Sequence, residues 1–114
     1  MSNISYTETL FTGSVTGDGN TTATPITTQR LKEGIFYLDV TAIGAGTTLT
    51  VDLRTYDSIA DNWHMLARWT SRTTTGQDAG YIQFGLGEKV AVYYAFSGGT
   101  TTATFTVNAH LKEF

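Results

Sequence analysis

The sequence predicts an all-β domain, an antiparallel β-sandwich or jelly roll of about seven or eight strands with an extended N-terminal arm. Apolar and polar residues alternate with a period of two in several segments, as they do in strands with one buried face. Glycine and Asp or Asn turns separate these segments, and no segment between them has a helical pattern. Because a single sheet would expose one face of every strand, we expect two sheets packed face to face.

The alternation is clearest between Gly34 and Leu111. The last strand, in residues 101–114, has an uninterrupted apolar face, so we expect it to lie at the centre of its sheet. Gly44-Ala45-Gly46 predicts a hairpin turn, since glycine adopts positive φ without steric cost. The inward residues expected in these strands are Phe36, Leu38, Val40, Ala42, Leu49, Val51, Leu53, Ile82, Phe84, Leu86, Val90, Val92, Tyr94, Phe96, Ala103, Phe105, Val107, Ala109 and Leu111.

Residues 63–70 fit two patterns. As a strand, the segment places Trp63, Met65, Ala67 and Trp69 on one face. As a helix it would be only two turns long, which is marginal for an isolated helix between strands. We therefore predict a strand.

The length of 114 residues favours a single domain. Residues 31–114 are expected to form the sandwich, and residues 1–30 an N-terminal strand followed by an extended Gly/Thr-rich arm. Such an arm can add a strand to the sheet edge of a neighbouring molecule. Pro25 suits an extended or edge position, because proline cannot donate to a strand ladder.

Composition excludes several classes of function. The net charge of -3 and the scattered basic residues argue against nucleic-acid binding. The absence of cysteine excludes disulfides and thiolate metal sites. No stretch is apolar enough for a membrane span or a signal peptide, so we expect a soluble protein with no membrane partner. Threonine, about one residue in five, suits a neutral, pleated surface.

No catalytic pattern stands out. The sequence lacks a G-x-S-x-G nucleophile motif, and His64 and His110 fall on expected outward faces of different strands. Asp57, Asp61 and Asn62 have oxygen ligands that suit calcium, but the same residues stabilise ordinary turns, and their spacing is not that of an EF-hand. We therefore expect turn chemistry there, no metal or cofactor, and no enzyme activity.

The aromatic residues outnumber what one small core needs. Exposed Tyr and Trp rings stack on sugars or anchor protein interfaces. An alternative is that Trp63 and Trp69 close the ends of the sandwich. The candidate interface residues are Tyr37, Tyr56, Trp63, Trp69, Tyr93 and Pro25.

Three segments resemble a known group of proteins. They read G-x-G-T-T-L-T-V-D-L from Gly44, D-x-x-x-D-N-W-x-x-L-A at 57–67, and G-G-T-T-T-A-T-F-T-V near the C-terminus. The sequence is similar in style, over about residues 34–111, to the β-sandwich or jelly-roll decoration proteins, also called cement proteins, of tailed bacteriophages.

This resemblance implies a protein without catalytic residues that is made in the host cytoplasm and binds the outside of the phage capsid. Its partners would be the major capsid protein and copies of itself, a homotrimer being favoured and a dimer possible. Two other readings of the sequence remain open. One is a carbohydrate- or receptor-binding module, and the other is a structural component of the phage tail or baseplate.

Overall fold

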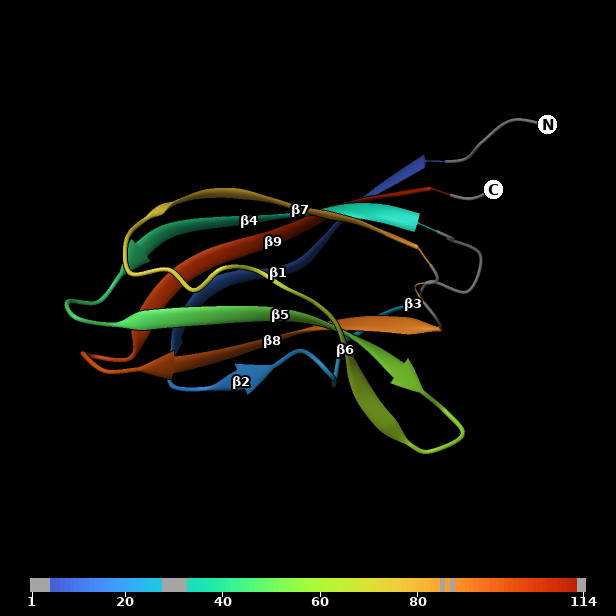
Figure 1. Ribbon diagram of the computed structural model, residues 1–114, viewed down its shortest axis with the longest axis horizontal. Coiled ribbons are helices and arrows are strands. Elements are labelled where there is room, and N and C mark those ends of the chain that lie inside the picture. The colour runs from blue at the N-terminus through green and yellow to red at the C-terminus, as the bar shows by residue number, and fades with distance from the viewer. Residues whose placement is uncertain (1–4, 28–32, 85, 87, 113–114) are drawn as a thin grey trace.

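The computed structural model describes residues 5–27, 33–84, 86 and 88–112, which form two antiparallel sheets packed face to face (Figure 1). The first sheet has the order β1 (Ser5–Thr16), β9 (Thr102–Lys112), β4 (Glu33–Ile43) and β7 (Gly76–Phe84). The second has the order β2 (Gly19–Asn20), β8 (Lys89–Ser97), β5 (Thr48–Asp57) and β6 (Asn62–Arg68), and β3 (Ile26–Thr27) also pairs with β8. The described part of the chain contains no helix that could cross a membrane.

The strands pair in a nested order. β1 pairs with β9, β2 and β3 with β8, β4 with β7, and β5 with β6, and all these pairs are antiparallel. The chain is thus folded into a long two-stranded ribbon that is closed by the β5–β6 hairpin. Along this ribbon, successive strand pairs belong alternately to the first and the second sheet. This arrangement is a jelly roll. It confirms the predicted fold class, and β9 lies between β1 and β4, as its apolar face predicted.

Alternate residues of the central strands fill the space between the sheets. In β9, Phe105, Val107 and Leu111 are each 0% exposed. Burying one such side chain contributes about 1.5–3 kcal/mol relative to leaving it in water. Ala42 departs from the expected pattern, because the register with β9 shifts just after Val40 and leaves Ala42 exposed. The other predicted inward residues that are almost fully buried are Phe36, Leu38, Val40, Leu49, Val51, Leu53, Leu86, Val90, Val92, Ala103 and Ala109. The side chains of Ile82 and Phe84 lie outside the described part of the structure.

The turn at residues 44–46 is not the predicted hairpin. β4 and β5 belong to different sheets, so this turn carries the chain from one sheet to the other, and the turn between β8 and β9 does the same. The two turns contact each other. The Gly44 amide donates to the Thr102 carbonyl at 2.8 Å, and the Thr101 amide donates to Thr47 Oγ1 at 3.1 Å. Glycine permits a chain reversal in either arrangement, and only the pairing with distant strands decides which one forms.

The predicted arm is part of the fold as far as the structure describes it. The N-terminal strand β1 extends to Thr16, into the Gly/Thr-rich segment expected to be an arm, and pairs with β9 over its length. Leu10 is 8% exposed, and the Phe11 ring packs on Phe105 with 4.6 Å between ring centroids. A register shift at Leu10 lets the adjacent residues Leu10 and Phe11 both face the core. This breaks the strict alternation of inward and outward residues that the sequence pattern predicts.

The rest of the predicted arm lies along the second sheet. β2 and β3 are short segments that pair with β8, β3 at its first two residues and β2 near its middle. These segments are strands only because they pair with β8, which is distant in the sequence. They contain no apolar run of their own, so their sequence predicts a loop. Residues 1–4 and 28–30 lie outside the described residues.

β6 is a strand, as predicted, but its apolar residues do not share one face. The register with β5 shifts at Leu66, which adds one residue to β6. Before the shift, Trp63 and Met65 lie on the outer face of the sheet. After it, Ala67 faces the core, and Trp69 just beyond β6 is 6% exposed.

The contact between the two crossing turns predicts unequal effects of two glycine substitutions. Gly17 and Gly99 both have positive φ, of 80° and 59°. A Cβ at Gly17 would meet nothing within 4 Å, whereas one at Gly99 would lie 2.4 Å from the Ala45 carbonyl oxygen. We expect Gly17→Ala to cost about 1 kcal/mol from backbone strain. Gly99→Ala should cost about 1–3 kcal/mol more, because the turns must separate. Urea unfolding measures both, and equal losses would contradict the packed arrangement of the turns.

Candidate functional site

Three of the six predicted interface residues lie on one surface, the outer face of the second sheet. Tyr56 lies on β5, Trp63 on β6 and Tyr93 on β8. We call this surface the β8–β5–β6 face. Its outward side chains are Thr50, Asp52, Arg54, Tyr56, Trp63, Met65, Arg68 and Tyr93.

The structure separates the other three predicted residues. Tyr37 is 42% exposed on the outer face of the first sheet, on the opposite side of the molecule from Tyr93. Trp69 belongs to the core, so for this residue the structure supports the alternative that it fills the sandwich. Pro25 is half-buried just before β3. Local sequence pattern does not predict these positions, because they depend on which sheet a strand joins for Tyr37, on the bulge in β6 for Trp69 and on the pairing of β3 with β8 for Pro25.

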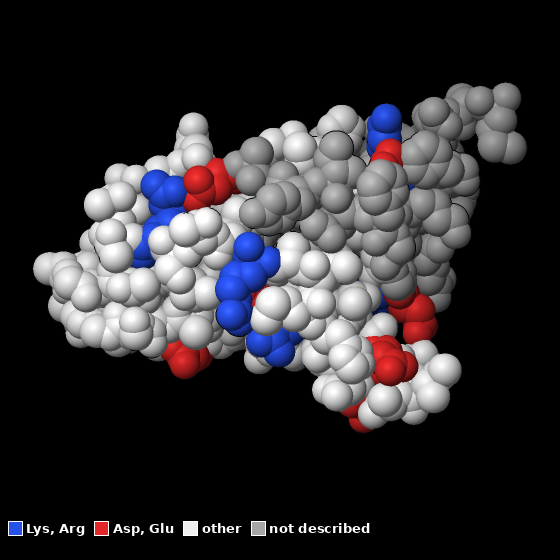
Figure 2. Space-filling view, in the orientation of Figure 1, with Lys and Arg blue, Asp and Glu red and all other residues white. Residues whose placement is uncertain are grey.

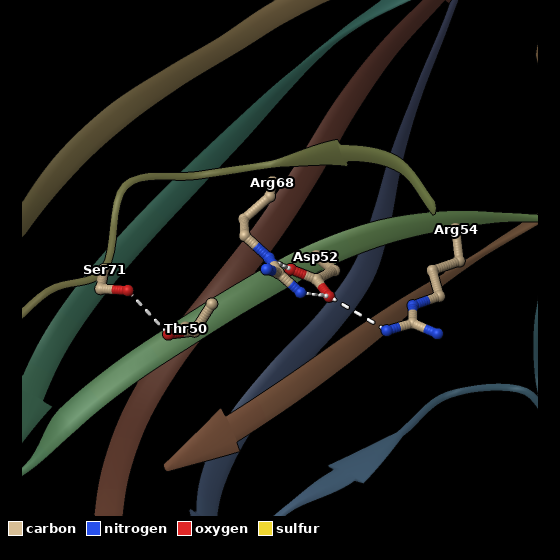
Figure 3. A network of polar contacts seen from close by, with 5 residues as sticks. All are labelled: Thr50, Asp52, Arg54, Arg68 and Ser71. Carbon is tan, nitrogen blue, oxygen red and sulfur yellow. Dashed lines mark hydrogen bonds and ion pairs between the residues drawn. The ribbon is translucent and has the colours of Figure 1, made fainter. Parts of the chain in front are cut away.

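An ionic cluster occupies the centre of the β8–β5–β6 face (Figure 3). Arg68 donates from Nε to Asp52 Oδ1 at 2.5 Å and from Nη2 to Oδ2 at 2.9 Å. Arg54 donates from Nη2 to the same Oδ2 at 3.2 Å, and its guanidinium lies 4.2 Å from the centroid of the Tyr93 ring. The two-pronged contact fixes β6 against β5, and the stacking on Tyr93 links β5 to β8.

Asp52 is the buried member of this cluster. Its side chain is 6% exposed, although it points to the outer face, because the two arginines cover it. Burial by itself would raise the pKa of Asp52, but the hydrogen bonds from Arg68 and Arg54 outweigh burial and hold the pKa below its ordinary value. The same contact raises the pKa of Arg68. Asp52 therefore stays ionised at neutral pH.

A shallow depression of about 390 Å³ lies beside the cluster, lined by both charged and neutral polar groups. Asp18 and Asn20 border it from the β1–β2 connection and β2, and Tyr93 from β8. Asp18 Oδ1 accepts the Phe96 amide at 2.8 Å, which anchors this side. With two carboxylates and two guanidiniums, the lining carries no net charge and offers both donors and acceptors. Such a lining suits a neutral, hydroxyl-rich ligand better than an anion.

The end of the β5–β6 hairpin is held by its own polar side chains. Asp57 Oδ1 accepts the amides of Ile59 at 3.0 Å and Ala60 at 3.3 Å, and these bonds lower the pKa of Asp57. Tyr56 donates its hydroxyl to Asp61 Oδ1 at 2.5 Å. The Tyr56 ring also packs on Trp63 with 5.1 Å between centroids. The turn chemistry predicted for Asp57 and Asp61 is confirmed.

The histidines lie far from each other in the fold. His64 is on β6 with Nε2 3.5 Å from Asp57 Oδ2, and His110 is exposed on β9 in the other sheet. Among the residues that the structure describes, no three His, Cys, Asp or Glu side chains gather in a way that would hold a metal ion.

The outer face of the first sheet is a ladder of hydroxyl and amide groups. Across β1 and β9, Thr9 donates to Asn108 at 2.8 Å, and Ser14 and Thr104 lie 2.6 Å apart. Between these pairs the hydroxyls of Thr12 and Thr106 lie 2.9 Å apart. These cross-strand pairs satisfy one another, so the part of the face formed by β1 and β9 carries neutral groups that are already hydrogen-bonded.

Sequence reasoning missed two features of the second sheet. The alternation in residues 48–54 turns Asp52 away from the inward Val51 and Leu53, but it does not predict the burial of Asp52 under Arg54 and Arg68, because Arg68 reaches Asp52 only after the bulge in β6. Ile59 is 98% exposed at the hairpin end. The one available signal was an isoleucine placed among turn-forming residues, where no core face can receive it.

Comparisons with known proteins relate this chain to others by fold. No protein-family model and no curated protein matches the sequence. The structure is similar to that of the SPBc2 prophage-derived protein YomS, with a TM-score of 0.64 and 13% identity over 99% of this chain and 96% of YomS. The Yersinia pseudotuberculosis-derived mitogen YPM aligns with a TM-score of 0.42 and 17% identity, over 95% of this chain and 84% of the mitogen. The similarity to YomS is one of fold.

The ionic cluster predicts an asymmetry between its members. Removing Arg68 leaves the Asp52 carboxylate, still partly covered by Arg54, without its two-pronged partner. Removing Asp52 leaves two guanidiniums whose side chains are 50% exposed in Arg68 and 29% exposed in Arg54 and can be hydrated. At pH 7 we expect Arg68→Ala to destabilise the fold more than Asp52→Ala, which should cost about 1 kcal/mol. Urea unfolding of both variants measures this.

The asymmetry should disappear in acid. Because the pKa of Asp52 is lowered from 3.8, its charge stabilises the wild-type fold above that pH. This contribution is lost as the pH falls below 3.8 and through the lowered pKa. The difference in free energy of unfolding between wild type and Arg68→Ala should therefore disappear when urea unfolding is measured from pH 7 down to pH 2. A gap that stays constant over this range would contradict the role given to Asp52.

Proposed function

We propose that this chain is a structural virion protein that binds the outer surface of a bacteriophage capsid and stabilises the shell. The observation that carries the proposal is the full-length fold similarity to YomS, a protein that derives from a prophage. The jelly roll is also a recurrent fold of viral capsid domains. The segments at 44–53, 57–67 and 98–107, which resemble decoration proteins, lie in the described part of this fold.

The surface of the molecule supports a role in assembly. The hydroxyl ladder of the first sheet and the ionic cluster of the second are internally satisfied, so neither needs a small ligand to complete it. The β5–β6 hairpin presents apolar and aromatic side chains outward. Tyr and Trp are the residues that most often contribute strongly at protein interfaces. The major capsid protein and further copies of this chain, as a homotrimer, are the proposed partners.

The proposal predicts how particles behave without the protein. Virions that lack it should assemble but lose resistance to heat, chelators or osmotic shock, because the shell subunits are no longer clamped together. Adding the purified protein back to such particles should restore resistance. The measurement is the surviving titre of stripped, complete and reconstituted particles. Equal survival of all three would count against a stabilising role.

A position on the tail or baseplate is the closest alternative, since the same fold would serve there with different neighbours. Immunogold labelling of virions separates the two positions. Label on the head is expected, and label confined to the tail would assign the protein to the tail.

A second candidate function is saccharide binding, favoured by the depression beside Tyr93. Its lining combines carboxylate, amide and guanidinium groups with an aromatic ring, the groups that recognise sugar hydroxyls. Tyr56, Trp63 and Tyr93 do not form a flat platform on which a sugar could stack, because Tyr56 and Trp63 are tilted by 48° against each other and Arg54 covers one face of Tyr93. We therefore place this function second. A glycan array with wild type and Tyr93→Ala tests it, and a signal lost only in the variant would support it.

A further inference from the structure

The β5–β6 hairpin carries an apolar side chain, that of Ile59, which is not packed against the rest of the protein. Ile59 is 98% exposed, and Met65 on the same hairpin is 49% exposed. Together with Tyr37 they are the large hydrophobic residues most exposed in the described part of the chain. Single exposed apolar residues are common on protein surfaces, so exposure alone decides little. The surroundings of Ile59 are more informative.

The loop that carries Ile59 is fixed in place. The amides of Ile59 and Ala60 bond to Asp57, and Asp61 receives the Tyr56 hydroxyl. Asp61 also has a positive φ of 52°, a conformation that non-glycine residues adopt at an energetic cost. A loop already held in one conformation loses less entropy when it binds, so its apolar tip is suited to binding.

The hairpin also extends beyond the sheet that carries it. β5 pairs with β8 as far as Thr55, opposite Val90, and after that it pairs only with β6. Figure 1 shows this end of the hairpin diverging from the body of the sandwich. A projecting tip can enter a recess in another protein, which a flat sheet surface cannot do.

The charge around the tip indicates what kind of recess fits. Asp57 and Asp61 flank Ile59, and Figure 2 shows acidic side chains gathered over this end of the molecule, while Lys and Arg gather at the middle of the face. The hydrogen bond to Asp61, and the charges of Asp61, Glu88 and Asp57, raise the pKa of Tyr56. Lys89, 4.8 Å from the centre of the Tyr56 ring, offsets part of this charge. A complementary partner would carry an apolar pocket with Lys or Arg at its rim.

We propose that the tip of the β5–β6 hairpin, with Ile59 at its apex, is the anchor that inserts into a basic-rimmed apolar pocket of the capsid shell protein. The inference rests on the proposed function and names the part of this chain that makes the contact. Met65 and the paired rings of Tyr56 and Trp63 form the apolar flank of the same hairpin.

The test is co-sedimentation of the full chain with purified capsid shells that lack it. Wild type should bind, and Ile59→Asp should bind at least about tenfold more weakly, as expected when a central interface residue is lost. Ile59→Leu should bind like wild type, because it keeps an apolar tip. Ala45→Asp is the matched control, since it adds the same charge at an exposed turn at the other end of β5. Raising the salt concentration should weaken wild-type binding by screening the acidic rim.

The outcomes separate the inference from the proposed function. Wild type that fails to bind shells would overturn both. Wild type and Ile59→Asp that bind equally well, or an equal loss in Ala45→Asp, would overturn the anchor alone. Thermal unfolding checks that the variants keep the fold, which an exposed tip residue should not affect. Sedimentation velocity completes the test, since Ile59→Asp that dissociates an oligomer while still binding shells would assign the tip to self-association and overturn the inference.

Discussion

The sandwich depends on the burial of the inner face of β9. This strand pairs with β1 on one side and β4 on the other, so the first sheet is continuous only through it. Its inward residues from Ala103 to Leu111 are buried against the second sheet. Since β9 is the last strand in the chain and β1 the first, this contact joins the two ends of the sequence. Such long-range pairing is slow to form, because distant parts of the chain must meet before the contact contributes to stability.

Most apolar residues of the strands are buried between the sheets, and the two outer faces differ in their chemistry. On the first sheet, threonine and serine hydroxyls pair across β1 and β9 and leave little charge. On the second, Arg68 and Arg54 converge on Asp52, and the contact of Arg68 with Asp52 fastens β6, an edge strand, to β5. Charged groups on an edge strand also discourage unwanted sheet extension. Both faces therefore contribute to stability by bonds within the chain.

The β5–β6 hairpin differs from the rest of the surface in this respect. It closes the two-stranded ribbon of the jelly roll, and its last residues have no third strand to pair with. Its polar side chains hold the loop, while Ile59 has no apolar contact of its own. This combination of a fixed backbone and an unused apolar side chain is what links the fold to the proposed role in assembly.

The sequence alone determined the fold class, the inward faces of the central strands, the central place of β9 and the turn at Asp57, because these follow from two-residue alternation and from local side-chain bonds. The tertiary structure decided what depends on distant partners. The bulges at Leu10 and Leu66 reverse the inward and outward positions, and a period of two cannot predict where the register shifts. The turn at 44–46 crosses between sheets, and residues 12–27 fold against β9 and β8, because strand pairing over most of the chain length outweighs local pattern. The burial of Asp52 and the exposure of Ile59 follow from the same pairing, since Arg68 and the hairpin reach their places only through it.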